Sequence, residues 1–265
     1  MASQAPNNIL PLLYQDLEPL NRNMHANYKV RRVGGLDRVA SVHAIPVTVD
    51  EFAVAQRHYP IVFSTGDNSI PIALMGLHEG TNTFFDEKGE AREPNIYIPA
   101  YLRRYPFVLA RLREDSDELS LCFDPTSGAV GEFDEGEPLF DGEDPSEATK
   151  AVLQFCEQFE QAGHRTQAFM NELKESGLLM DGEVAIQPEG AEQPFIYRGF
   201  QMIDEEKFQN LRGDELRKLN QNGGLALIMA HLFSLSVIRE IFGRQVRQGT
   251  GPVGLTAPIP ATADA

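Results

Sequence analysis

Residues 58–109 read HYPIVFSTGDNSIPIALMGLHEGTNTFFDEKGEAREPNIYIPAYLRRYPFVL, and this stretch indicates the fold class. Short apolar runs alternate in it with Gly, Asn and Pro, which is typical of a small antiparallel sheet. The pattern predicts four strands, at residues 61–63, 72–77, 82–85 and 95–98. Residues 86–89 should form the turn between the last two strands, because Gly89 can adopt a positive φ.

Weaker patterns precede this stretch. Residues 1–26 contain three prolines and are expected to form an extended arm. Residues 27–49 alternate apolar and polar side chains on both sides of Gly34-Gly35, and so predict two strands. Thr48 with Glu51 three positions later is a capping-box pattern, which predicts a short helix to about residue 56.

The pattern changes after a further predicted strand at residues 119–123. Asp144 and Pro145 look like the cap and first position of a helix, and Gly163 and Gly177 like the ends of two successive helices. Further predicted elements are a hairpin at 184–187 and 195–199 around a polar turn at 188–194, short helices capped by Asp204 and Asp214, and a final apolar helix at 225–242 that should be the longest and buried.

This order predicts an α+β fold, in which an N-terminal antiparallel β-rich half is followed by a C-terminal helical half with a long buried final helix. Whether the halves form separate domains is open at this point. The expected parts are an arm (1–26), a β-rich part (27–123), an acidic loop (124–144), a helical part with a hairpin near 184–199 (145–243) and a flexible tail (244–265).

Charge is concentrated in one segment of the 265-residue chain, whose net charge is −16. Residues 114–149 carry 13 acidic groups and no Lys or Arg. Nucleic acid is therefore excluded as a partner, because proteins bind it by neutralising phosphates with Lys and Arg. Cys122 and Cys156 predict two free thiols, and residues 225–238 are too short for a membrane span. The expected location is the cytoplasm.

Arg103 and Arg104 are the strongest candidates for a ligand site. They lie between Tyr101 and Tyr105, so the guanidinium groups could capture a carboxylate or phosphate while the rings act as stacking walls. Alternatively, both arginines pair with the chain's own acidic loop at 124–144. In an extended segment neighbouring side chains point to opposite faces, so one arginine should be buried and the other exposed.

Other polar residues carry weaker signals. His43 and Asn82 complete the candidate ligand set, although Asn82 and Asp86 also suit a hairpin turn and His43 lies within a predicted strand. His231 is expected to be a hydrogen-bonded core histidine. No catalytic motif, metal-ligand spacing or nucleotide-binding loop is present, so no catalytic residue, metal or cofactor is predicted.

The chain contains a series of short motifs that together carry a family resemblance. They are Pro19-Leu20-Asn21 with His25, His43-Ala44-Ile45-Pro46-Val47 with Glu51-Phe52, HYPIVF at 58–63, Gly76-Leu77 with Asn82 and FFDEKG at 84–89, YIPAYLRRYPF at 97–107, Leu139-Phe140, Leu178-Leu179, Gly199-Phe200 with Ile203-Asp204-Glu205, and Gly224-Leu225 with AHLFSL at 230–235. From residue 19 to about 242 the chain resembles the bacterial SapC family. It departs from the family at Ala91, where members often have a larger, usually aromatic residue.

The resemblance and the absence of any catalytic motif together lead us to expect a binding or accessory protein without catalytic activity. It would act with a bacterial surface-layer or outer-membrane uptake and peptide-transport system, through a protein or peptide partner. The alternative is an enzyme of unrecognised type that acts on a peptide or an aromatic small molecule. Its candidate residues would be His43, Asn82, Tyr101 and Arg103, and they would have to converge in one pocket.

Overall fold

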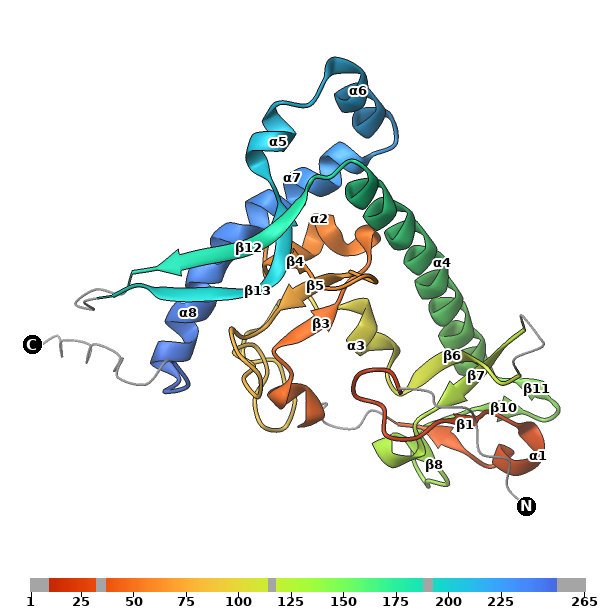
Figure 1. The fold of residues 1–265 in the computed structure, drawn as a ribbon. Helices are drawn as coiled ribbons and strands as arrows, with labels where there is room; N and C mark the ends of the chain where they lie inside the picture. Colours follow the sequence, from red (N-terminus) through yellow and green to blue (C-terminus); the bar gives the residue numbers. More distant parts are fainter. Residues whose placement is uncertain (1–9, 32–36, 114–117, 188–192, 252–265) are drawn as a thin grey trace, which may run out of the picture.

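The computed structural model describes residues 10–31, 37–113, 118–187 and 193–251 (Figure 1). Its N-terminal half contains β1 (Glu18–Pro19), α1 (Arg22–His25), β2 (Lys29–Val30), η1 (Asp37–Ser41), β3 (Ala44–Pro46), η2 (Val49–Glu51), α2 (Phe52–Ala55), β4 (Ile61–Phe63), β5 (Pro71–Leu74), α3 (Ala100–Arg104), β6 (Phe107–Arg111) and β7 (Leu119–Phe123).

The second half begins with η3 (Pro125–Ser127) and four two-residue strands, β8 (Val130–Gly131), β9 (Glu137–Pro138), β10 (Phe140–Asp141) and β11 (Asp144–Pro145). It continues with α4 (Glu147–Glu175), β12 (Leu179–Ile186), β13 (Phe195–Ile203), α5 (Glu205–Gln209), α6 (Gly213–Gln221), α7 (Gly224–Ser234), η4 (Leu235–Val237) and α8 (Ile238–Arg247).

The central sheet joins the two halves of the chain. Its strand order is β12-β13-β4-β5-β3, and every neighbouring pair is antiparallel. All three residues of β4 are fully buried, as expected for an apolar strand in the middle of a core. The pairing of Gln201 with Phe63 adds the C-terminal hairpin to a sheet that the N-terminal half begins. The halves are therefore not separate structural units.

The described residues form three hydrophobic clusters, of which the third contains Tyr14, Val108 and Cys122. The other two are called the main cluster and the small cluster here. The main cluster contains β4, β5 and the inner faces of α2 and α7. The small cluster lies between the sheet β1-β7-β6 and the sheet β8-β2-β9, and its buried residues are Phe107, Phe123, Val130, Leu139 and Cys156.

Helix α4 spans both clusters and is the longest element described here, with 29 residues (Figure 1). Cys156 in its N-terminal half belongs to the small cluster, whereas Phe169, Met170 and Leu173 in its C-terminal half belong to the main one. The sequence predicted two helices that end at Gly163 and Gly177, with Asp144 as the first cap. Instead one helix continues through Gly163, and Ser146 caps it by accepting a hydrogen bond from the Thr149 N–H.

The α+β fold class and its order are confirmed, and so are the strands at β4, β5, β7, β12 and β13. The predicted strands at 82–85 and 95–98 are wrong, and an isolated bridge between Phe85 and Ala91 is what forms there. The Asn82 side chain explains the first error, because its Oδ1 accepts the N–H groups of Phe84 and Phe85 that a strand would need.

The same amide also explains why the second of the two strands predicted within residues 27–49 is short and begins only at Ala44. Asn82 Nδ2 donates to the carbonyl oxygens of Val39 and Val42, each at 2.9 Å. These carbonyl groups are therefore taken, and the backbone forms the 3₁₀ turn η1 before β3 begins. The predicted turn at 86–89 is confirmed, because Asp86 accepts from Lys88 and Glu90 and Gly89 has φ +72°.

The predicted final helix at 225–242 is not a single helix and is not the longest one, because the segment consists of α7, η4 and α8 and the longest helix described is α4. Three further details differ from expectation. Asp204 caps α5 as predicted, but Arg212 rather than Asp214 precedes α6. The acidic segment 124–144 contains short strands instead of a plain loop, and α8 continues to Arg247, within the expected tail. Predictions for 1–9, the Gly34-Gly35 break, most of the 188–194 turn and 252–265 lie outside the described residues.

Residues Gly224–Arg247 form a helical segment that is long and apolar enough to cross a membrane, judged by length and composition alone. This segment is longer than the apolar stretch at residues 225–238, which alone is too short to span a membrane. However, 44% of its most apolar window is buried inside the protein, and the core helix of a soluble protein passes the same test. The His231 side chain on this segment is fully buried.

Candidate functional site

Helix α3 carries both candidate arginines, so the expectation of an extended segment here is wrong. The cause is Glu51, a buried residue far away in sequence. Its Oε1 accepts hydrogen bonds from the Ala100 N–H at 2.7 Å and the Tyr97 hydroxyl at 3.0 Å, and its Oε2 accepts from the Thr48 N–H at 2.8 Å. A carboxylate at Ala100 satisfies an N–H that the first helical turn leaves free.

Arg104 is 8% exposed and lies among aromatic rings. Its Cζ is 4.3 Å from the ring centroid of Phe159, 4.6 Å from that of Tyr101 and 6.0 Å from that of Tyr14. The contacting carboxylate is Glu160, whose Oε1 lies 3.6 Å from Nη1, and Arg104 Nε has no hydrogen-bond partner. The buried charge is therefore incompletely compensated.

Arg103 is exposed, so the predicted asymmetry of the pair is present although the backbone is helical. Its Cζ lies 5.1 Å from the Phe155 ring centroid and 5.7 Å from that of Tyr97, and Nη2 donates to the Tyr97 hydroxyl at 3.3 Å. The alternative pairing with the acidic loop is not seen in the described ranges. There, Arg103 contacts Tyr97 and Phe155, and Arg104 contacts Glu160.

A cleft of about 630 Å³ lies beside these arginines, where the main cluster and the small cluster meet. Its lining includes Arg31, Arg103 and Arg104, and none of the described lining residues is Asp or Glu. Most of the wall is apolar, and Phe155 is part of it. Phe85, Ile98 and Leu102 come from the main cluster, and Phe107 and Val152 come from the small one. Three cations thus line a largely apolar cleft in a protein with a net charge of −16.

Arg31 is held at the rim by its own contacts. Its Cζ lies 3.8 Å from the Phe133 ring centroid, and its Nε donates to the Gly128 carbonyl at 3.2 Å. Guanidinium groups commonly stack on rings in this way while other N–H groups remain available. No local sequence pattern points to Arg31, because Phe133 and Gly128 are about a hundred positions away along the chain.

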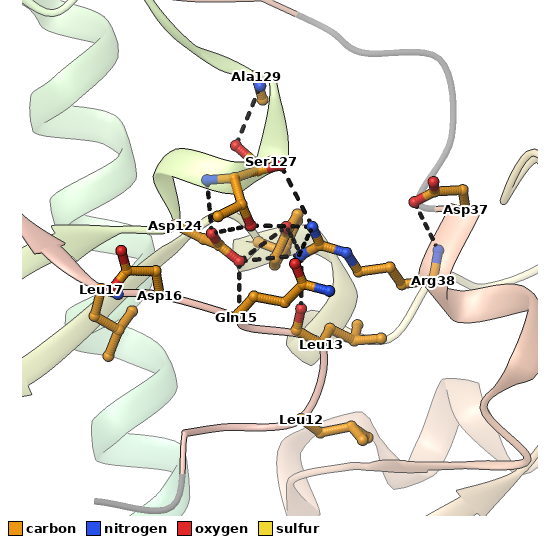
Figure 2. A network of polar contacts seen from close by, with 12 residues as sticks. Leu12, Leu13, Gln15, Asp16, Leu17, Asp37, Arg38, Asp124, Ser127 and Ala129 are labelled. Atoms are coloured by element: carbon orange, nitrogen blue, oxygen red, sulfur yellow. Dashed lines mark hydrogen bonds and ion pairs between the residues drawn. The ribbon is translucent and has the colours of Figure 1, made fainter.

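A polar network is centred on Asp124 and Arg38 (Figure 2), and Tyr105 of the cleft wall bonds to it. Asp124 is fully buried and accepts from Arg38 Nη1 and the Tyr105 hydroxyl, each at 3.2 Å, and from the Gln15 N–H at 2.9 Å. Arg38 Nη1 also donates to the Leu13 carbonyl at 3.1 Å. The arm is thereby tied to β7 and to the end of α3.

The charge of Asp124 is held by hydrogen bonds. Burial alone would raise its pKa, but bonds from the Thr126 hydroxyl and N–H, the Gln15 N–H and Tyr105 outweigh burial and set the pKa below its ordinary value. Burial, with the negative charge of Asp124, raises the pKa of Tyr105 to about 12. Tyr105 therefore remains a neutral donor to Asp124.

Comparison with protein families decides the classification. The SapC family model matches residues 20–241, which is most of the chain and includes every residue of the cleft lining. The chain belongs to the SapC family. Neither the curated proteins nor the solved structures gave a match to it.

In this SapC-family chain, the predicted ligand residues separate into two groups. Arg103, Arg104 and Tyr105 line the cleft, while Tyr101 lies behind it as a ring against Arg104 and donates its hydroxyl to the Leu12 carbonyl at 2.9 Å. Asn82 is occupied by the backbone bonds described above and borders a different, polar depression.

His43 does not join the cleft lining either. Burial lowers its pKa, while Glu79 raises it to a smaller extent, and its carbonyl accepts the N–H groups of Met75 and Gly76. The four residues of the enzyme alternative therefore do not share one pocket in the described structure. No group of three or more His, Cys, Asp or Glu residues suited to a metal ion occurs in the described part of the chain.

Proposed function

We propose that this SapC-family protein is a binding or accessory protein without catalytic activity, and that the cleft at α3 takes a carboxylate- or phosphate-bearing ligand. One observation carries the proposal. Arg31, Arg103 and Arg104 line one cleft without an acidic neighbour in its described lining, although acidic residues outnumber basic ones by 39 to 23 in the chain. Such a surface attracts anions.

The chemistry of the cleft suits reversible binding. Arginine presents a planar set of donors that matches a carboxylate or phosphate, and apolar walls exclude water and strengthen the contact. No nucleophile with an adjacent base lies in the described lining, where the thiol of Cys156 is buried and burial raises its pKa to about 11. A buried thiol of this kind is a poor nucleophile at neutral pH.

The biological setting is proposed from family resemblance. The protein would act in the cytoplasm with a surface-layer or outer-membrane uptake and peptide-transport system, and would bind a peptide or protein partner there. Affinity capture from a native extract under mild conditions should recover that partner.

Calorimetric titration with a panel of carboxylates, phosphates and acidic peptides tests the binding step. We expect at least one class to bind, with affinity that falls as salt rises and at least tenfold in Arg104→Met. Arg165→Met is the matched control, because Arg165 is an exposed arginine of α4 that pairs with Asp50 at 2.5 Å and is not part of the cleft lining. Absence of binding by every anion, together with turnover in a metabolite screen, would contradict the proposal.

A further inference from the structure

We infer that the ligand of this cleft is an amphipathic monocarboxylate, that is, one carboxylate group on an alkyl or aryl body. This inference rests on the proposed function and specifies its ligand. It follows from three properties of the cleft, which are the kind of cation, the polarity of the walls and the position of the cleft relative to the ends of α3.

The cations suit a carboxylate. All three are arginines, whose paired N–H groups match the two oxygens of a carboxylate as they match two oxygens of a phosphate, so the choice between these groups rests on the backbone. Arg104 supplies a buried positive charge. Its Nε lacks a hydrogen-bond partner, and its Nη1 lies 3.6 Å from the carboxylate of Glu160. Arg103 is exposed and can supply N–H donors on the solvent side of the cleft. Its Nη2 donates to the Tyr97 hydroxyl, which leaves other N–H groups of the guanidinium for a ligand.

A phosphate fits the cleft less well. Phosphate sites commonly use the N–H groups at a helix N-terminus or in a glycine-rich loop. Arg103 and Arg104 instead lie in the last turn of α3, where the helix presents carbonyl groups. The α4 N-terminus is already capped by its own Ser146, which accepts from Thr149. A doubly charged head group would therefore lack the backbone donors that it normally receives.

The walls favour an apolar body over a peptide. A peptide brings an N–H and a C=O in each residue, and each costs free energy when it leaves water without a partner. Beyond the arginines, the side chains in the described lining that offer polar atoms are Tyr105, Ser127 and Cys156. Tyr105 is already bonded to Asp124, and Ser127 Oγ already accepts from the Ala129 N–H.

The size of the cleft sets the size of the ligand. About 630 Å³ lies within the usual range for sites that hold drug-sized molecules, so a medium-length alkyl chain or a substituted aryl group can be enclosed. The walls come from both hydrophobic clusters, with Phe85, Ile98 and Leu102 on one side and Phe107 and Val152 on the other. One apolar body would thus contact both clusters at once.

Calorimetry with matched probes tests the class. The probes are hexanoate, octanoate and decanoate, 4-phenylbutanoate with its alcohol, amide and amine analogues, 4-phenylbutyl phosphate, and an acetylated tetra-alanine with a free carboxylate. We expect decanoate or 4-phenylbutanoate to bind best. The alcohol and amide should bind at least tenfold more weakly, the amine should not bind, and each added methylene should tighten the Kd of the alkyl series about threefold.

Variants locate the site. Arg103→Gln should weaken carboxylate binding at least fivefold, and Ala151→Phe should block it without changing any charge, because Ala151 is an exposed residue of the lining. Arg165→Gln should bind as the unmodified chain does. Thermal melts that match the unmodified protein confirm that each variant is folded, and binding that survives Ala151→Phe would overturn the assignment of the cleft.

The outcomes separate the two proposals. If the phosphate or the peptide binds in an Arg103-dependent way and the alkyl and aryl carboxylates do not, the ligand class is wrong while the proposed function stands. If the alcohol binds as tightly as the carboxylate, the class is also wrong, because the arginines would then play no part. If no anion binds, both proposals fail.

Discussion

Arg103 and Arg104 show how differently two neighbouring residues can be used. Arg104 is buried among rings with incomplete compensation, so its charge is not a source of stability. We expect Arg104→Met, which retains most of the packing, to leave the free energy of unfolding within about 1 kcal/mol of the original or to raise it. Denaturant melts measure this quantity. A loss of about 3 kcal/mol or more would mean that the guanidinium itself holds the structure together.

The exposed neighbour is the control. Arg103→Met removes one 3.3 Å hydrogen bond and two ring contacts at the surface, and should cost about 0.5 kcal/mol. If Arg103→Met and Arg104→Met are both stable but bind anions more weakly, the two arginines serve ligand binding and not stability. Two stable variants with unchanged binding would identify an ordinary charged surface.

His231 makes stability depend on pH. Its Nδ1–H donates to the Ile61 carbonyl at 2.7 Å, and its Nε2 accepts the Ile203 N–H at 3.1 Å, so the neutral ring joins α7 to β4 and β13. Burial lowers the pKa of His231 from 6.5 to about 4, and the bond to Ile61 opposes this only partly. As the pH falls, the unfolded chain therefore binds a proton at this ring near pH 6.5, whereas the folded chain binds it only near pH 4.

Stability should fall as pH drops from about 6.5 to about 4, with a total loss from this residue of about 3 kcal/mol. Urea melts of His231→Leu and the original chain across this range measure the difference. The variant should be less stable at pH 7.5, because two hydrogen bonds are gone, but its dependence on pH should be shallower. His164→Leu, at an exposed position, should keep the original dependence.

Among the secondary-structure elements, α3 and α4 show where sequence reasoning fails. The motif at residues 97–107 identified the family and the two arginines, and the asymmetry of their burial was foreseen. Its helical backbone could not be foreseen, because Glu51, about fifty positions earlier, supplies the hydrogen bonds that favour it. Gly163 predicts a helix end, but α4 continues through it because contact with two hydrophobic clusters outweighs the weak helix propensity of glycine.

Two glycines, one within α4 and one just after its end, give opposite predictions for substitution by alanine. Gly163 lies within the helix, and a Cβ built there meets no atom within 4 Å, so Gly163→Ala should stabilise the protein by about 0.5–1 kcal/mol. Gly177 follows the helix with φ +63°, and Gly177→Ala should destabilise it by about 1 kcal/mol. Melts of the two variants, side by side, test whether α4 is one continuous helix. A break at residue 163 would make Gly163→Ala neutral or harmful.

On the scale of the whole molecule, the sequence predicted the order of the elements but not the cleft. The lining residues run from Val30 to Cys156, and they meet because two hydrophobic clusters pack on the same helix. Arg31 and the Arg38–Asp124 network carried no local signal for the same reason, since their contacts join segments about 90 to 110 positions apart. Tertiary contacts of this kind are invisible to spacing rules.

The unequal size of the clusters gives a prediction about local unfolding. The small cluster has five buried residues in the described structure, so it should open at a lower free energy than the main sheet. Amide hydrogen exchange should therefore be faster in β2 and β8 than in β4 and β5. A bound carboxylate that contacts both clusters should slow exchange in β2 and β8. Arg103→Gln should reduce this effect at a ligand concentration close to the Kd of the original chain.

The pairing of β4 with β13 has a consequence for synthesis on the ribosome. β4 is complete at Phe63, but the strand that covers its free edge begins at Phe195, and His231 on α7 arrives later still. At typical elongation rates this interval is on the order of 10 s. During that time, a fully apolar strand has an open edge in the nascent polypeptide. A chaperone that binds extended apolar segments would find its main target there, and release would become favourable once the C-terminal hairpin has emerged.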